Sequence, residues 1–95
     1  MNRLVLSATI AETSALRYTP AGLPALDFRL EHESEVLEAG QARQVKAALK
    51  AVAIGSVAES LVRQPVGSRW GFTGFLATPR NGKHPVLHIQ SFEPI

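Results

Sequence analysis

Residues 25–32, ALDFRLEH, contain the clearest strand pattern in the chain. From position 26 onward, apolar and polar side chains alternate, with Leu26, Phe28 and Leu30 on one face and Asp27, Arg29 and Glu31 on the other. A period of two is the period of a β-strand that buries one face. The preceding residues 19–24, TPAGLP, contain two prolines and a glycine, and they predict a turn or loop.

Four further segments predict strands. Residues 3–10, RLVLSATI, alternate with Leu4, Leu6, Ala8 and Ile10 on the buried side. Residues 43–54 are rich in alanine, a helix former, but their β-branched residues and the following Gly55 favour a strand in which Lys46 and Lys50 share one face. Residues 66–79, with Gly71 and Gly74 allowing a bulge, and residues 85–92 complete the set.

One short helix is expected over residues 56–65. Ser56 is the predicted N-cap, Glu59 completes a capping box with it, and Pro65 is the predicted stop. The acidic residues 31–42, EHESEVLEAGQA, predict a long solvated connection. Near the C-terminus, Asn81 and Gly82 within RNGK (80–83) predict a tight hairpin turn, with Pro79 and Pro85 interrupting strand pairing beside it.

Five strands with one helix between the third and fourth predict an all-β fold. The best match is the OB-fold, a small five-stranded barrel that is partly open. An SH3-like barrel is the competing topology, disfavoured because it has shorter strands and usually lacks a helix at this place. The length of 95 residues predicts a single domain over residues 1–95, which would gain stability by burying a face against a second copy.

Composition narrows the classes of function. The absence of cysteine excludes a disulfide scaffold, a thiolate metal site and a cysteine nucleophile. Neither a signal peptide nor a membrane-spanning apolar run is found, so a cytoplasmic protein without membrane contact is expected. Residues 1–38 carry three arginines against six carboxylates, a sum of −3, whereas residues 39–95 carry seven Lys or Arg against two Glu, a sum of +5. The charge asymmetry hints at an anionic partner for the second half, although a folded domain mixes both halves on its surface.

An enzyme is not predicted. His84 and His88 lie in or beside a strand without an adjacent carboxylate, so a zinc site is not expected. His32 stands among Glu31, Glu33 and Glu35, a run that is more often a solvated surface than an acid–base site. No phosphate-binding glycine loop or nucleophile elbow occurs, and no cofactor is predicted.

Five segments together resemble the bacterial primosomal replication protein N family (PriB), relatives of single-stranded DNA-binding protein. They are NRLVLSATI (2–10), TPAGLPALDFRLEHES (19–34), EAGQARQ (38–44), VGSRWGFTGFL (66–76), and NG (81–82) followed by VLH (86–88). The resemblance covers nearly the whole chain. It implies an OB-fold homodimer that binds single-stranded DNA during replication restart and bridges the primosomal helicase and the primosomal loader protein.

The resemblance also implies site residues. Dimers of the family pair through the N-terminal strand, here Arg3–Ile10, with the interface expected at Arg3, Leu4, Val5, Leu6 and Ser7. The expected DNA contacts, placed by the barrel pattern and the resemblance together, are Arg17, Tyr18, Arg43, Lys46, Arg80 and Lys83. Trp70 and Phe72 are expected in the core or at an interface.

Three positions depart from the family pattern. Gln41 and Lys46 stand where aromatic residues that stack on bases are expected, and Glu33 stands where a basic residue is expected. Loss of one stacking platform costs roughly 1–3 kcal/mol per base. The departures therefore predict weaker and more electrostatic DNA binding.

Two other functions compete with this one. The departures favour a protein-interaction scaffold that keeps the fold and has little intrinsic affinity for DNA. A general single-stranded DNA-binding protein is less expected, because that class usually ends in a glycine-rich spacer and an acidic tip, whereas this sequence ends at FEPI.

Overall fold

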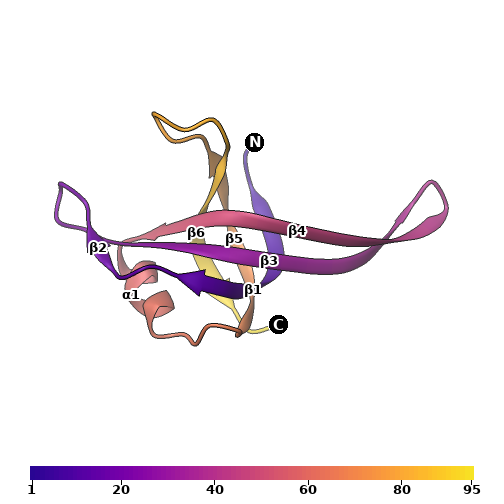
Figure 1. Cartoon of the computed structure of the whole chain (residues 1–95), viewed down its shortest axis with the longest axis horizontal. Helices are drawn as coiled ribbons and strands as arrows, with labels where there is room; N and C mark the ends of the chain where they lie inside the picture. The colour runs from indigo at the N-terminus through magenta and orange to yellow at the C-terminus, as the bar shows by residue number, and fades with distance from the viewer.

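The computed structural model describes residues 1–95 and consists of six strands and one short helix (Figure 1). In chain order they are β1 (Leu4–Thr13), β2 (Arg17–Tyr18), β3 (Pro24–Glu38), β4 (Gln41–Ile54), α1 (Ser56–Val62), β5 (Arg69–Ala77) and β6 (Val86–Glu93). No helix is long and apolar enough to cross a membrane.

The strands close into a five-stranded barrel. The sheet order is β1-β5-β6-β4-β3-β2, and a further pairing of β1 with β3 closes the ring. Only β4 and β6 run parallel, and β2 is a two-residue addition to the edge of β3. The helix α1 lies between β4 and β5, which are the third and fourth strands of the barrel. The prediction of an all-β, five-stranded OB-type barrel with one helix at this place is confirmed.

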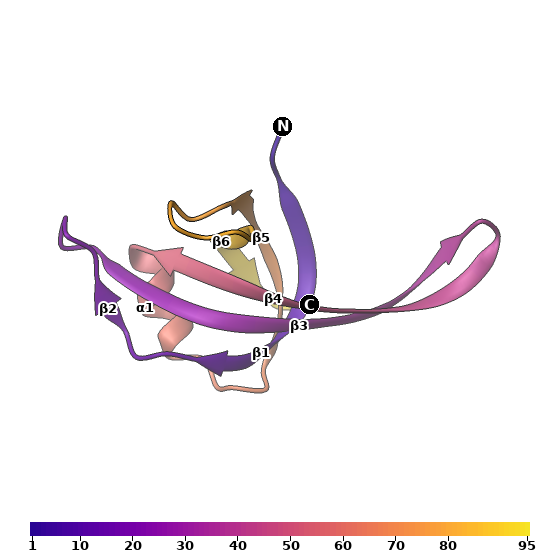
Figure 2. The same cartoon turned by 45° about the horizontal axis from the view of Figure 1, so that its top comes forward.

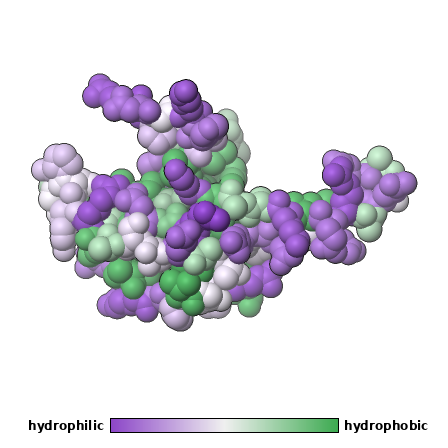
Figure 3. All heavy atoms as spheres, in the orientation of Figure 1, coloured by the Kyte–Doolittle hydropathy of each residue, from purple (hydrophilic) through white to green (hydrophobic).

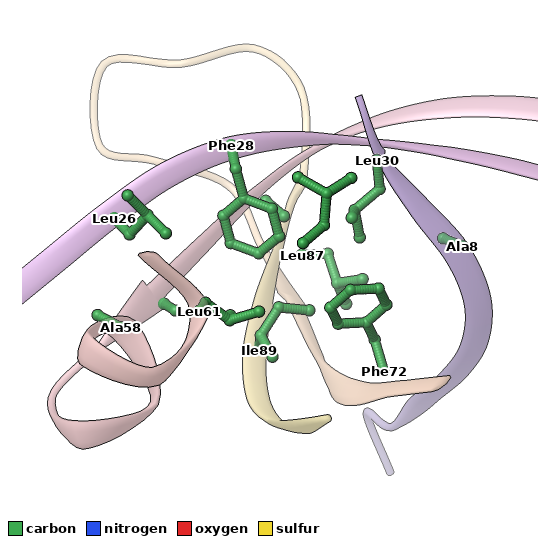
Figure 4. Packing of buried hydrophobic residues seen from close by; sticks show 12 residues of the cluster. Ala8, Leu26, Phe28, Leu30, Ala58, Leu61, Phe72, Leu87 and Ile89 are labelled. Atoms are coloured by element: carbon green, nitrogen blue, oxygen red, sulfur yellow. The ribbon is translucent and has the colours of Figure 1, made fainter. Parts of the chain in front are cut away.

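The barrel interior contains the faces that the sequence predicts. Leu26, Phe28 and Leu30 are buried, and Ala8 and Ile10 from β1 join them. Figure 4 shows how side chains from β3, β5 and β6 meet around Phe28 and Phe72, while α1 adds Ala58 and Leu61 at one end of the barrel. Burial of these apolar side chains is the main force that holds the barrel together, and each leucine, isoleucine and phenylalanine among them contributes about 1.5–3 kcal/mol.

The start of the helix differs from the prediction. Ser56 is already helical, the N-cap is Gly55 with a φ of 90°, and no side-chain capping hydrogen bond forms. The chain leaves β4 and enters the helix within one residue, and the positive φ needed for this turn suits glycine. The helix ends at Val62, three residues before the predicted stop at Pro65.

The predicted solvated connection over residues 31–42 is instead part of a long hairpin. β3 and β4 remain paired as far as Glu38 and Gln41, and the two residues between them, Ala39 and Gly40, have φ values of 52° and 77°. A two-residue turn with positive φ at both positions matches the twist of paired strands. We call residues 32–48 the arm. It projects from the barrel along the longest dimension of the molecule, which measures 49 × 29 × 21 Å (Figures 1 and 2).

The prediction of a tight turn at Asn81–Gly82 is wrong. β5 ends at Ala77 and β6 begins at Val86, which leaves an eight-residue loop, 78–85. Within it the N–H of Gly82 donates to the carbonyl of Pro79 at 3.0 Å, so Arg80 and Asn81 are the central residues and neither has a positive φ. Pro79 and Pro85 cannot donate to a ladder, and pairing therefore stops before the Asn-Gly dipeptide can close it.

Candidate nucleic-acid interface

The six residues predicted to contact DNA lie in three separate parts of the molecule. Arg17 and Tyr18 form β2, Arg43 and Lys46 lie on the arm, and Arg80 and Lys83 lie in loop 78–85. Figure 1 shows β2 and the arm at opposite ends of the long axis, with loop 78–85 rising from the barrel between them. They therefore do not form one pocket, and a ligand that touched all of them would have to be extended.

Arg17 is held by a carboxylate. Its Nε donates to Oδ2 of Asp27 at 2.6 Å and its Nη2 to Oδ1 at 3.1 Å, a two-pronged ion pair that leaves about half of each side chain exposed. The hydrogen bond from Arg17 keeps the pKa of Asp27 below its usual value, although partial burial opposes this effect, and the carboxylate raises the pKa of Arg17. Tyr18 beside it is 67% exposed, so its ring is open to solvent.

The two cations of the arm are also paired. Arg43 donates to Glu38, and Nζ of Lys46 lies 3.4 Å from Oε1 of Glu33, its direct neighbour across the ladder. Glu33, which is expected to repel phosphate, thus faces a lysine within the same ribbon. The surface of the arm is mostly hydrophilic (Figure 3), yet its opposite charges largely balance.

Loop 78–85 presents cations of a different kind. Arg80 and Lys83 are exposed, and neither takes part in any of the four ion pairs of the structure. Because no carboxylate competes for them, they are the predicted DNA contacts most available to an external anion.

The N-terminal strand has one unpaired edge. Residues Leu4–Thr9 pair with β5, and β3 joins β1 only from Thr9 onward. Nδ1 of His32 donates to the carbonyl of Ser7 at 2.6 Å, so this carbonyl points away from β5. The side chain of Val5 is 68% exposed. Before Thr9, the segment predicted as a dimer interface therefore has no strand partner on the edge away from β5, where only the Ser7 carbonyl is bonded by a side chain, and it carries an exposed apolar side chain.

The aromatic residues divide into core and surface. Phe72 is buried and Trp70 is half-buried against Phe92, with ring centroids 5.1 Å apart. Phe75 and His88 stack with ring centroids 4.8 Å apart and ring planes 11° apart, a contact that the sequence does not predict. They are cross-strand partners in the β5–β6 ladder, and only the register reveals this pairing. No group of three or more His, Cys, Asp or Glu residues that could hold a metal ion is present.

Comparison with known proteins identifies relatives over nearly the whole chain. A family model described as another single-strand binding protein family matches residues 2–91. The replication restart protein PriB of Bordetella pertussis is 50% identical over 91 residues, which cover 95% of this chain and 85% of that protein. The solved structure of PriB from Ralstonia solanacearum superposes with a TM-score of 0.90 at 39% identity, covering 99% of this chain and 97% of the other. The SSB domain of a Synechococcus protein gives 0.74 at 25% identity, with coverage of 98% and 94%.

Proposed function

Since the chain belongs to the family of the replication restart protein PriB, we propose that it binds single-stranded DNA and acts in the restart of DNA replication. The observation that carries the proposal is the pair of uncompensated cations, Arg80 and Lys83, on a loop that borders the outer face of the barrel. In OB-folds the loop before the last strand flanks the surface that binds oligonucleotides.

The mechanism of binding is neutralisation of phosphates along an extended strand. Lys and Arg side chains displace the counterions of the DNA backbone, and this release drives association. Arg80 and Lys83 contact phosphates directly, whereas Arg17, Arg43 and Lys46 must exchange a carboxylate for a phosphate. The exposed ring of Tyr18 offers a base one stacking surface.

We also propose a homodimer joined through residues Arg3–Ser7, a segment whose edge away from β5 has no strand partner in the single chain. An exposed, unpaired strand edge is a template for pairing with another chain. The dimer acts in the cytoplasm as a binding protein without a cofactor, and it bridges the primosomal helicase and the primosomal loader protein.

Salt-dependent binding of a labelled oligothymidylate tests the DNA proposal. We expect binding at low salt, with affinity falling steeply as salt rises. The double variant Arg80→Glu/Lys83→Glu should bind more weakly, with the slope of log affinity against log salt reduced by about 0.7 for each phosphate that is no longer neutralised.

The control compares two single variants that change the net charge equally: Arg80→Glu in the loop, and Arg63→Glu, just after α1. An equal effect of the two single variants would mean that net charge, and not the loop, governs binding. Absence of binding by the wild-type protein at low salt would overturn the DNA proposal.

One observation favours a second function. Three of the six predicted contact residues, Arg17, Arg43 and Lys46, already have carboxylate partners. A protein-interaction scaffold with little intrinsic DNA affinity would have this balanced surface. Helicase association without measurable DNA binding at low salt would support the scaffold.

A further inference from the structure

Two cations stand directly opposite each other on the outer face of the barrel. Arg29 of β3 and Lys50 of β4 are partners in the register, and both are exposed. Side chains at directly opposite positions have Cβ atoms about 4.5–5.5 Å apart, and like charges placed so are destabilising. The other directly opposite charged pair of this ladder, Glu33 and Lys46, joins opposite charges. The Arg29–Lys50 pair is therefore an electrostatic cost to the fold.

The carboxylates nearby compensate only part of this positive charge. Nη1 of Arg29 lies 3.4 Å from Oε1 of Glu12, and both side chains are about half exposed or more. Asp27 is occupied by Arg17. Lys50 forms no ion pair, so its charge is left without a partner.

The pair lines a surface hollow of about 450 Å³, and the two carboxylate residues just named, Glu12 and Asp27, line it as well, each paired with an arginine. The hydroxyl residues Thr13 and Ser14, at the end of β1, and Val86, the first residue of β6, complete the polar and apolar sides of the lining used here. A tetrahedral anion bound here could accept hydrogen bonds from the two cations and from a hydroxyl. Charge-assisted hydrogen bonds of this kind are the strong ones.

The hollow lies between two loops that carry predicted DNA contacts: residues 14–23, which join β1 to β3 and include β2, and loop 78–85. Ser14 begins the connection that carries Arg17, and Val86 is the first residue after loop 78–85 with its Arg80 and Lys83. An extended polyanion running from one loop to the other along the outer face would cross β3 and β4 at the hollow.

We propose that Arg29 and Lys50 form a phosphate-binding pair at which the backbone of single-stranded DNA crosses the β3–β4 face between the two loops. The inference rests on the proposed function, and it adds two contacts that neither the resemblance nor the strand pattern assigns. A bound phosphate supplies the negative charge that the opposed cations lack. The pair thus costs stability in the free protein and gains affinity in the complex.

The test measures oligothymidylate binding against salt and unfolding in urea for the same variants. Lys50→Gln should weaken binding at low salt by about tenfold and lower the salt slope by about 0.7. The same variant should unfold at an equal or higher urea concentration, because one of two opposed like charges is gone. Lys50→Arg should retain binding, and Arg29→Gln/Lys50→Gln should lower the slope further.

Two controls separate this site from general charge effects. Arg63→Gln removes one charge after α1 and should leave the slope unchanged. Lys46→Gln removes a cation that is already paired with Glu33. This variant should have a lower or unchanged urea midpoint, and its DNA binding should weaken less than that of Lys50→Gln.

The outcomes distinguish this inference from the proposed function. Wild-type binding together with an unaltered slope in Lys50→Gln would remove the pair from the interface and leave the function standing. A wild-type protein that does not bind the oligonucleotide would overturn both. If inorganic phosphate raises the urea midpoint of the wild type as much as the oligonucleotide does, and raises that of Arg29→Gln/Lys50→Gln less, the pair is a site for free phosphate and the DNA assignment is overturned, since general exclusion of phosphate from the protein surface would stabilise both proteins equally. Loss of binding accompanied by lower stability in Lys50→Gln would assign the lysine a structural role.

Discussion

At the scale of single residues, the partner of each charge decides what it can bind. The residue types at the candidate site are predictable from the sequence, because loop positions and strand faces follow from the pattern. The pairing of cations with carboxylates is not predictable from the sequence. It depends on the register of β3 and β4, which stay paired through residues 31–42, where the composition predicts a solvated connection. Lys46 meets Glu33 only because β3 and β4 stay paired along the arm.

Glu33→Gln should free Lys46 and strengthen binding to single-stranded DNA. An exposed ion pair is worth about 0.2–1 kcal/mol, so the affinity at low salt should rise by up to about fivefold while stability changes by less than about 1 kcal/mol. Oligothymidylate titrations of the variant and the wild type measure this change. Glu59→Gln, which removes a carboxylate from α1 and so alters net charge equally, is the control. Equal gains in the two variants would show that net charge, not release of Lys46, is responsible.

At the scale of elements, the sequence predicts which side chains of a strand face the core better than it predicts where a helix or strand begins and ends. The alternation at Leu26, Phe28 and Leu30 is confirmed because only one register buries these side chains. The arm is not predicted because the acidic composition of residues 31–42 favours a solvated connection over a strand. In addition, Ala-Gly is a weaker signal for a hairpin turn than Asn-Gly. The helix cap is missed because Gly55 makes the turn that a serine side chain is expected to stabilise.

The turn at the end of the arm is not optimal for its conformation. Ala39 has a φ of 52°, a conformation that costs a residue with a Cβ about 1–2 kcal/mol and that asparagine tolerates better. Ala39→Asn should therefore stabilise the arm by about 0.5–1 kcal/mol, seen as up to fivefold slower hydrogen exchange of amides near the turn. Gly40→Ala should destabilise the arm, because Gly40 also has a positive φ, which disfavours a residue with a Cβ. The added Cβ would meet no atom within 4 Å, so the loss would come from the backbone conformation alone. Faster exchange in Ala39→Asn would contradict this account of the turn.

At the scale of the whole molecule, the barrel is closed but one strand edge is not used. The carbonyl of Ser7 points away from β5, and backbone groups alternate along a strand, so those of Val5 point the same way. A second copy related by a two-fold axis near Val5 would pair with this edge and cover its exposed side chain.

Sedimentation of the wild-type protein should therefore show a dimer that dissociates on dilution, and Val5→Lys should weaken it. Two lysines would meet near the axis and the apolar packing of Val5 would be removed, which together raise the dissociation constant by about tenfold. Val66→Lys places the same charge on another exposed valine, 58% exposed and outside β1, and should leave the dimer intact. A wild-type protein that sediments as a monomer at all concentrations would exclude the proposed interface.

The hairpin arm has a further consequence, for how its length can change over evolution. Glu38 and Gln41 close a two-residue turn, and such turns follow a pair that exchanges both backbone hydrogen bonds. Such pairs recur at every second position of an antiparallel ladder. Insertions and deletions that keep this turn type must therefore come in blocks of two residues on each strand, with each block moving the tip by about 7 Å. The distance that the arm extends from the barrel therefore changes in steps. Homologues are expected to differ by four residues at a time in this segment.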